Sequence, residues 1–347
     1  MIDFRKWIKS KSWITQPQWP LFFTIAGMVL VLIGCKGENP AYEKEIAEPE
    51  PKQDTRLSVT TTLFPYYDFV RQIAGDKVKL RLIIPSGMDS HSFEPTPADI
   101  LAIQNSDLFL YNGGEMEQWA DEILSSVEHP GLHTAAMMDF VEVVEEELVE
   151  GMEDGHSEEE HVPGQVHEVE KDEHIWTSPV MAMEIVRVIG GFLEEEDPEH
   201  KEFYRENTEK YLLELEGLHR EFWEIMENRK QDMIVVGDKF PFRYFADTYH
   251  LSYRAAFSGC GGEAEPSART IAYLIEQVRE RNLPAVFYLE LSSHRVAEII
   301  GEETGARPLL FHSCHNVTRR EFDEGITYLQ LMEQNVRNLR IGLEAEE

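Results

Sequence analysis

Cysteine is scarce in this chain, which has only Cys35, Cys260 and Cys314 among its 347 residues. Three cysteines allow at most one disulfide, so no disulfide framework holds the fold. In an oxidising compartment Cys260 and Cys314 either pair, or one of them binds a metal, and the sequence does not decide between these roles. The length is sufficient for one large or two medium domains with a substantial core.

Basic residues are also few. Lys and Arg number 32 against 65 Asp and Glu, which gives a formal net charge of -33 at pH 7. Such an acidic protein repels phosphates, so binding to nucleic acid through a basic patch is excluded. A charge of this sign suits a soluble surface protein or one that attracts cations.

The apolar run from Leu21 to Ile33 is shorter than a transmembrane helix usually requires. Four basic residues precede it, and it ends in Val31-Leu32-Ile33-Gly34-Cys35, which resembles a bacterial lipoprotein signal. We therefore expect residues 1–34 to be a signal peptide and Cys35 to carry the lipid, with an uncleaved anchor as the alternative. Residues 35–56, rich in Glu, Pro and Lys, are expected to form a disordered tether. Either reading places the rest outside the cytoplasmic membrane.

β-branched and apolar runs alternate with segments of helical spacing in two stretches of the chain. Strands that alternate with helices indicate an α/β fold with parallel, doubly wound sheets. Residues 198–230 keep helical spacing throughout, which predicts one long helix. We expect two lobes, residues 57–197 and 231–347, each a small, mainly parallel sheet flanked by helices. The long rigid helix would join them, with a cleft between the lobes. The expected strands begin near Leu57, Asp76, Ser106, Met233, Tyr253, Ala285 and Pro308.

Residues 141–173 interrupt this alternation. They are mostly Glu and Asp, with His156, His161 and His167 among Gly and Pro, and show no apolar period. We predict a mobile surface loop in which the histidines collect divalent cations, most plausibly zinc, weakly. The alternative is a charged disordered insert without a binding role.

Several metal-ligating residue types follow predicted strands. His91, Glu290 and His312 lie at or just beyond strand ends, Asp238 directly follows another strand, and His174 opens a helix after a loop. Open α/β sheets bind ligands outside the carboxyl ends of their strands. Three imidazoles and a carboxylate form a tetrahedral set suited to zinc, whereas a carboxylate-rich set suits manganese.

The chain resembles the metal-binding lipoproteins of bacterial zinc and manganese ABC importers, the cluster A-I substrate-binding proteins. The resemblance covers nearly all of residues 59–343. It rests on Val-Thr-Thr-Thr-Leu-Phe-Pro-Tyr (59–66), Ser-His-Ser-Phe-Glu-Pro-Thr-Pro (90–97), His-Ile-Trp-Thr-Ser-Pro (174–179), Glu-Pro-Ser (265–267) and the segment 328–335. It implies two α/β lobes joined by a long helix, with the metal between them. Zinc-specific members also carry a histidine- and acid-rich loop, which residues 141–173 resemble.

The resemblance makes His91 and His174 the first two metal ligands. The third family histidine aligns with Lys239, and a protonated lysine cannot ligate a metal. The fourth family position aligns with His312, which would preserve a three-histidine site. Glu290 matches a family glutamate near the cleft and is either a ligand or a partner of one. Asp238 and Cys260 are the reserve ligands.

The resemblance implies a binding protein rather than an enzyme. It would capture zinc, with manganese as the alternative, while lipid-anchored on the extracytoplasmic face of the cell membrane. It would then deliver the ion to an ABC permease and its ATPase, which are separate chains because this sequence has no phosphate-binding loop. We expect a monomer. A surface adhesin is a further alternative, as is a zinc hydrolase with Glu290 as base, although no His-Glu-x-x-His motif is present.

Overall fold

The computed structural model describes residues 54–126, 130–152, 170–259 and 265–346. Its first sheet contains four strands, all paired in parallel, in the order β2-β1-β3-β4. The strands are β1 (Leu57–Thr61), β2 (Val78–Leu82), β3 (Leu108–Tyr111) and β4 (His133–Ala136). β3 is buried along its whole length, as its continuous apolar sequence Leu-Phe-Leu-Tyr predicts.

The second sheet repeats this arrangement. Its parallel strands follow the order β6-β5-β7-β8, the same winding as in the first sheet. They are β5 (Met233–Val236), β6 (Ser252–Ala255), β7 (Ala285–Tyr288) and β8 (Arg307–Leu310). Two α/β lobes with parallel sheets were expected from the sequence, and the architecture confirms them.

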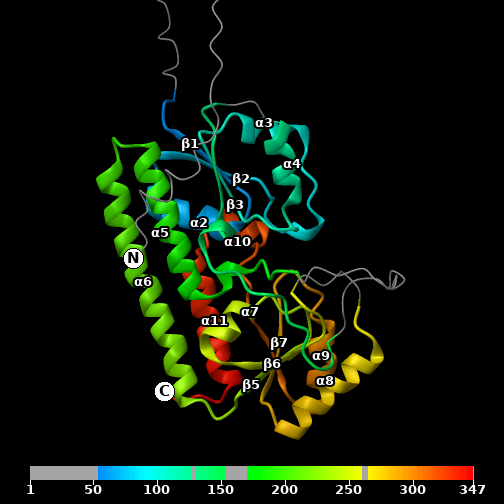
Figure 1. Ribbon diagram of the computed structural model, residues 1–347. Coiled ribbons are helices and arrows are strands. Elements are labelled where there is room, and N and C mark those ends of the chain that lie inside the picture. Colours follow the sequence, from blue (N-terminus) through cyan, green and yellow to red (C-terminus); the bar gives the residue numbers. More distant parts are fainter. Residues whose placement is uncertain (1–53, 127–129, 153–169, 260–264, 347) are drawn as a thin grey trace, which may run out of the picture. The chain divides into compact units, whose positions relative to one another are not determined.

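Helices cover both sheets (Figure 1). Proline in the first turn begins α2, α3 and α5, where a missing backbone N–H costs nothing, and reciprocal capping boxes begin α3, α10 and α11. The α-helices are α2 (Phe64–Ala74), α3 (Pro97–Gln104), α4 (Gln118–Ser126), α5 (Pro179–Glu196), α6 (Lys201–Asn228), α7 (Arg243–Tyr249), α8 (Ala268–Arg281), α9 (Arg295–Thr304), α10 (Arg319–Asp323) and α11 (Tyr328–Gly342). Three short 3-10 helices are η1 (Ser90–Ser92), η2 (Met137–Phe140) and η3 (Ile175–Thr177).

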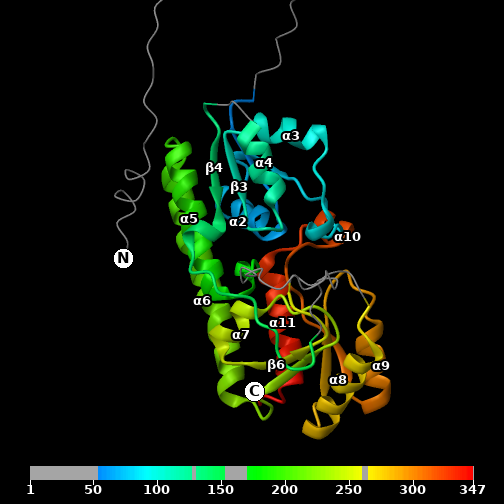
Figure 2. The ribbon, with the colours of Figure 1, turned by 45° about the vertical axis from the view of Figure 1, so that its right-hand side comes forward.

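Helix α6 runs alongside both lobes (Figures 1 and 2). It packs against α2 and α5 of the first lobe and against α7 and α11 of the second. Its 28 residues extend about 42 Å at the usual rise per residue. The predicted helix 198–230 is shortened at both ends, because Pro198–His200 form a turn and Arg229 is extended.

The two lobes are also tied together at a buried carboxylate on α2. Asp68 is fully buried and accepts hydrogen bonds from Arg71, from Gln72 and, at 2.7 Å, from the backbone N–H of Tyr328 at the start of α11. Arg71 in turn donates to the carbonyl of Ile326. The contact therefore joins the first-lobe helix α2 to the chain that enters the last helix.

The predicted loop 141–173 is anchored at its base. Residues 141–152 and 170–173 are described, and Glu145 and Lys171 form an antiparallel bridge there. The hydroxyl of Tyr244 on α7 accepts from the backbone N–H of Val144 and donates to the carbonyl of Asp172. The expectation of an unstructured loop is therefore wrong for its ends, whose backbone groups are satisfied against the second lobe.

Two further differences concern the first lobe and the termini. Strand β4 was not predicted, because His-Thr-Ala-Ala has little apolar or β-branched signal. The predicted signal peptide, nearly all of the tether, Cys260 and the histidines at 156, 161 and 167 lie outside the described residues.

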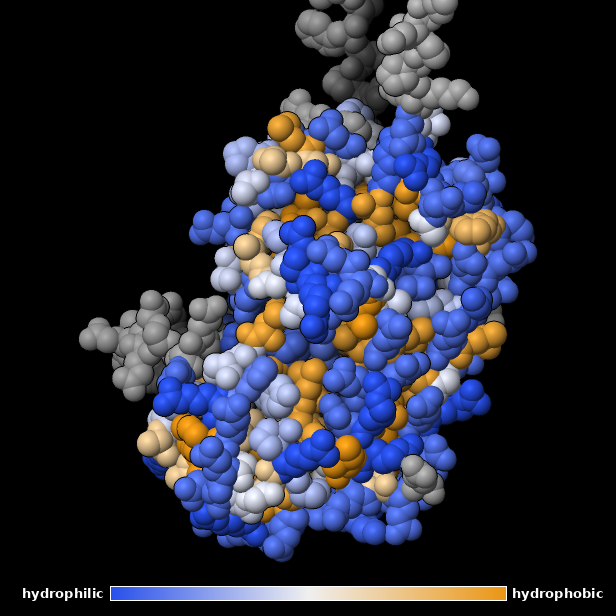
Figure 3. Space-filling model, turned by 180° about the vertical axis from the view of Figure 1, so that it is seen from behind, coloured by the Kyte–Doolittle hydropathy of each residue, from blue (hydrophilic) through white to orange (hydrophobic). Residues whose placement is uncertain are grey.

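No helix within the described ranges combines the length and apolar character needed to cross a membrane. On the face seen in Figure 3, hydrophilic residues surround small groups of hydrophobic ones.

We predict that Asp68→Ala lowers the free energy of unfolding by about 3 kcal/mol, because it leaves the buried side of Arg71 and the Tyr328 N–H unpaired. Urea denaturation monitored by circular dichroism measures the change. The control is Asp76→Ala, which removes an exposed carboxylate 3.8 Å from Lys77 and should alter stability by less than about 0.5 kcal/mol. Equal effects of the two substitutions would refute the proposed role of Asp68.

Candidate metal centre

Three histidines from three different loops meet beyond the carboxyl ends of the strands. His91, His174 and His315 each offer a ring nitrogen, and these atoms all lie within 4.8 Å of one another. The ring centroids are 5.6 to 5.9 Å apart. One ion can bridge donors at this spacing.

His91 lies in η1, in the loop that follows β2. The Asp89 side chain caps η1 by accepting the backbone N–H of His91 at 2.8 Å. The neighbouring Ser90 is buried, and its hydroxyl hydrogen-bonds the Nε2 atom of His315. The loop that carries the first histidine therefore also orients the third.

His174 is almost fully buried just before η3. Its Nδ1 lies 3.2 Å from a carboxylate oxygen of Asp172, which also accepts the backbone N–H of His174. A carboxylate on one ring nitrogen fixes the tautomer and leaves the other nitrogen for a metal. Gly259 also lies close to this ring, where an added Cβ would be 3.2 Å from its Cε1 and Nδ1 atoms.

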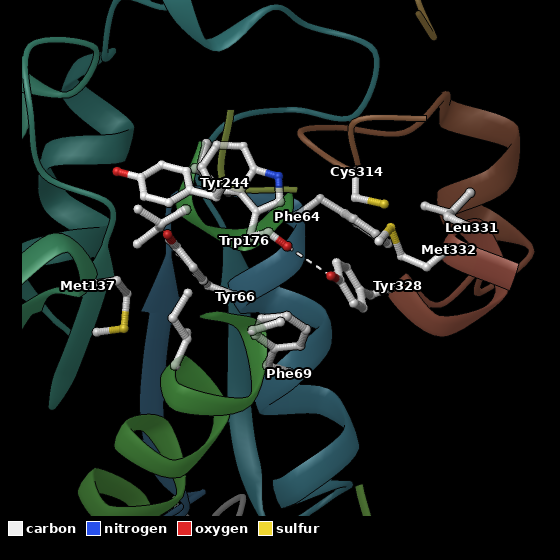
Figure 4. Packing of buried hydrophobic residues seen from close by; sticks show 14 of the residues in the cluster. Phe64, Tyr66, Phe69, Met137, Trp176, Tyr244, Cys314, Tyr328, Leu331 and Met332 are labelled. Atoms are coloured by element: carbon white, nitrogen blue, oxygen red, sulfur yellow. Dashed lines mark hydrogen bonds between the residues drawn. The ribbon is translucent and has the colours of Figure 1, made fainter. Parts of the chain in front are cut away.

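His315 follows β8 and lies against the buried Trp176, with ring centroids 5.0 Å apart. The indole N–H of Trp176 donates to the carbonyl of Ser313 at 2.9 Å. In Figure 4, Trp176 lies between Tyr66 of the first lobe and the segment that carries Cys314 and Tyr328. The second-lobe histidine is therefore held in place by a first-lobe side chain.

Burial and neighbouring charge set the protonation of the three imidazoles. Burial, together with the charge of neighbouring His174, lowers the pKa of His91 to about 4. Burial likewise lowers the pKa of His315 well below its ordinary value. Burial also opposes the charging of His174, but the negative charges of Asp172, Glu173 and Glu146 together outweigh it and raise the pKa of His174. Two of the three imidazoles are thus neutral at neutral pH, the state in which a ring nitrogen can bind a metal.

The histidines lie in a cavity of about 660 Å³ that residues of both lobes line. Asp238, Lys239 and Glu290 also line it, but among the described residues no carboxylate or thiol joins the group of three ring nitrogens. Glu290 instead accepts the backbone N–H of Ser313 at 2.7 Å and the hydroxyl of the same residue. It therefore fixes the loop that carries His315.

The structure places His312 outside this group. Its backbone N–H and carbonyl are bonded to the Asn335 side chain, and its Nδ1 accepts the backbone N–H of Cys314. The backbone at Cys314 has a positive φ of 60° and turns the chain, which presents His315 to the cavity. The sequence reasoning chose the histidine nearest the strand and missed the second one in His312-Ser313-Cys314-His315. That second histidine was the available signal.

Of the three cysteines, only Cys314 lies within the described residues. Its thiol is buried and free, and burial raises its pKa well above the ordinary value. A thiol in this state is a poor metal ligand and a poor nucleophile.

Three imidazoles grouped in a cleft between two α/β lobes define a metal-binding protein. Residues 59–342 match the family model described as ZnuA, zinc-uptake complex component A, periplasmic. The chain is 30% identical over 326 residues to the high-affinity zinc uptake system protein ZnuA of Bacillus subtilis, covering 94% of this chain and 98% of that protein. This chain therefore belongs to the ZnuA family.

Solved structures agree with this assignment. The metal-dependent lipoprotein YcdH of Bacillus subtilis has a TM-score of 0.69 and 28% identity, over 83% of this chain and all of that one. The Zn(II)-bound ZnuA-like domain of Streptococcus pneumoniae AdcA has a TM-score of 0.67 and 27% identity, over 83% of this chain and 99% of that one.

We predict that His315→Ala lowers zinc affinity at least about tenfold, because it removes one of three ligand nitrogens. Competition with a fluorescent zinc chelator measures the affinity. The control is His294→Asn, at a cavity-lining histidine outside the group whose positive φ asparagine tolerates. The decisive comparison is His312→Ala, which removes only a support of the Cys314 turn and should lower zinc affinity less than His315→Ala does. A larger loss for His312→Ala than for His315→Ala would restore His312 as the ligand.

Proposed function

We propose that this chain captures zinc outside the cytoplasmic membrane and delivers it to an ABC-type importer. The observation that carries the proposal is the group formed by His91, His174 and His315 in a member of the ZnuA family. Three imidazoles suit zinc, whereas manganese favours carboxylate and water oxygens. The ion is cargo, so the site must release it as well as bind it.

The partners follow from what the chain itself supplies. It offers a metal site and no phosphate-binding loop, so the permease and the ATPase are other proteins. The proposed lipid on Cys35 would keep the protein close to that permease at the extracytoplasmic face of the membrane. The sequence Val-Leu-Ile-Gly-Cys supports this anchor.

A hydrolytic role is less well supported. A zinc hydrolase needs a free general base beside the metal-bound water. Glu290, the candidate base, has both carboxylate oxygens engaged by Ser313. The arrangement favours holding an ion over activating a water.

The histidines at 156, 161 and 167 are proposed as an auxiliary site that collects zinc near the cleft. The base of their loop is held by Tyr253 and Arg243, whose side chains meet the Glu147 carboxylate at 3.1 and 3.2 Å. Ions gathered on this loop would therefore be released close to the second lobe.

The function is tested by titrating the full chain and a variant lacking residues 153–169 with zinc and, separately, manganese. We expect one tight zinc site in both proteins, tighter than the site for manganese, and additional weak sites only in the intact chain. The deletion keeps the Glu145–Lys171 bridge, so the fold is retained. Absence of a tight zinc site from the full chain would contradict the proposed function. Its loss from the deletion variant alone would contradict the auxiliary role of the loop.

The pKa values predict the pH dependence of zinc binding. His91 and His315 have lowered pKa values and are already neutral, so His174, with a raised pKa, is the ligand that must lose a proton. Zinc affinity should fall about tenfold per pH unit below the pKa of His174 and level off above it, with release of about one proton. Calorimetry in buffers of different ionisation enthalpy counts the protons. Release of two or three would contradict this account.

A further inference from the structure

Lys239 places a positive charge at the metal centre. It follows β5 and lines the cavity that holds the three histidines. His91, His174 and His315 line the same cavity, so the ammonium and the three imidazoles share one enclosed space. A cation beside a site for a divalent cation opposes binding unless a negative charge offsets it.

Four carboxylates of the described residues line the cavity, those of Asp89, Asp238, Glu265 and Glu290, but none of them is paired with the ammonium of Lys239. The ammonium of Lys239 makes no hydrogen bond or ion pair within the described part of the chain, although ammonium groups carry three donors. Asp89 instead accepts the backbone N–H of His91, Asp238 accepts that of Lys239, and Glu290 accepts both donors of Ser313.

The coordination of zinc is also incomplete. Zinc in proteins is usually four-coordinate, and the three histidines supply three nitrogens. No carboxylate or thiol of the described residues joins them, while the cavity of about 660 Å³ has far more room than one ion requires.

We infer that the fourth zinc ligand is a small external anion, a halide or a carboxylate, held between the metal and the ammonium of Lys239. The inference rests on the proposed function, since it requires zinc on the three histidines. An anion there would neutralise one charge on zinc, complete the tetrahedron and give Lys239 its missing partner. Zinc would then be captured together with an anion, and the positive charge of Lys239 would favour binding of that anion.

The test measures the zinc affinity of the full chain in sodium perchlorate, bromide and acetate at equal ionic strength. Perchlorate is a poor zinc ligand and serves as the reference. We expect the affinity to rise about tenfold in bromide, acetate or both, as for other contacts that support a metal ligand. Lys239→Met should abolish this rise. The control Arg295→Met, which removes another cation that lines the cavity, should retain it.

X-ray absorption at the zinc edge identifies the ligand directly. Bromine scatters more strongly than nitrogen, oxygen or the sulfur of Cys260, so a zinc–bromine distance in wild type that is lost in Lys239→Met would support the inference. A zinc affinity that rises in acetate alone identifies the ligand as a carboxylate. A zinc affinity that rises in bromide alone identifies it as a halide.

Three outcomes overturn the inference. Tight zinc binding with the same affinity in all three salts would overturn the inference and leave the proposed function intact. A zinc affinity of Lys239→Met that is lower than that of the wild type in all three salts would indicate that the lysine amine itself is the ligand. Absence of tight zinc binding in every salt would overturn the proposed function and this inference with it.

Discussion

The metal centre depends on the contact that Trp176 makes between the lobes. Its own carbonyl accepts the Tyr328 hydroxyl at 2.8 Å (Figure 4). Its indole N–H donates to the carbonyl of Ser313, and its ring lies against both His174 and His315. Because the side chain is fully buried, these hydrogen bonds have no competition from water. Together with the hydrogen bond between Ser90 and His315, this contact fixes the second-lobe loop relative to the first-lobe histidines.

The supporting groups divide into two sets with different tasks. Asp172 and Asp89 orient the first-lobe histidines from within their own loops, whereas Glu290 and Ser90 position the loop of His315. Removing a group from the first set would alter one ligand, while removing one from the second would shift how the lobes meet. Metal affinity and lobe geometry are therefore linked through the single segment 312–316.

The fold was largely predictable, because alternating strands and helices leave a strong local pattern. Strand β4 was missed, since its sequence His-Thr-Ala-Ala becomes a strand only by pairing with β3. Two members of the histidine group, His91 and His174, were predicted as ligands because rigid loops and a family motif mark them. His315 was not predicted, because its position depends on a left-handed turn at Cys314. Glycine or asparagine usually marks such a turn in a sequence, and neither is present there. Long-range contacts and this one unusual backbone angle determine the position of His315, and the only local signal for it was a second histidine three residues after His312.

The most direct test of the central claim is a crystal structure of the zinc-loaded protein with anomalous data collected on both sides of the zinc edge. The account predicts one strong anomalous peak within bonding distance of ring nitrogens of His91, His174 and His315, with His312 still bonded to Asn335 and Cys314. A peak bonded to His312 and Glu290, with His315 turned away, would contradict it.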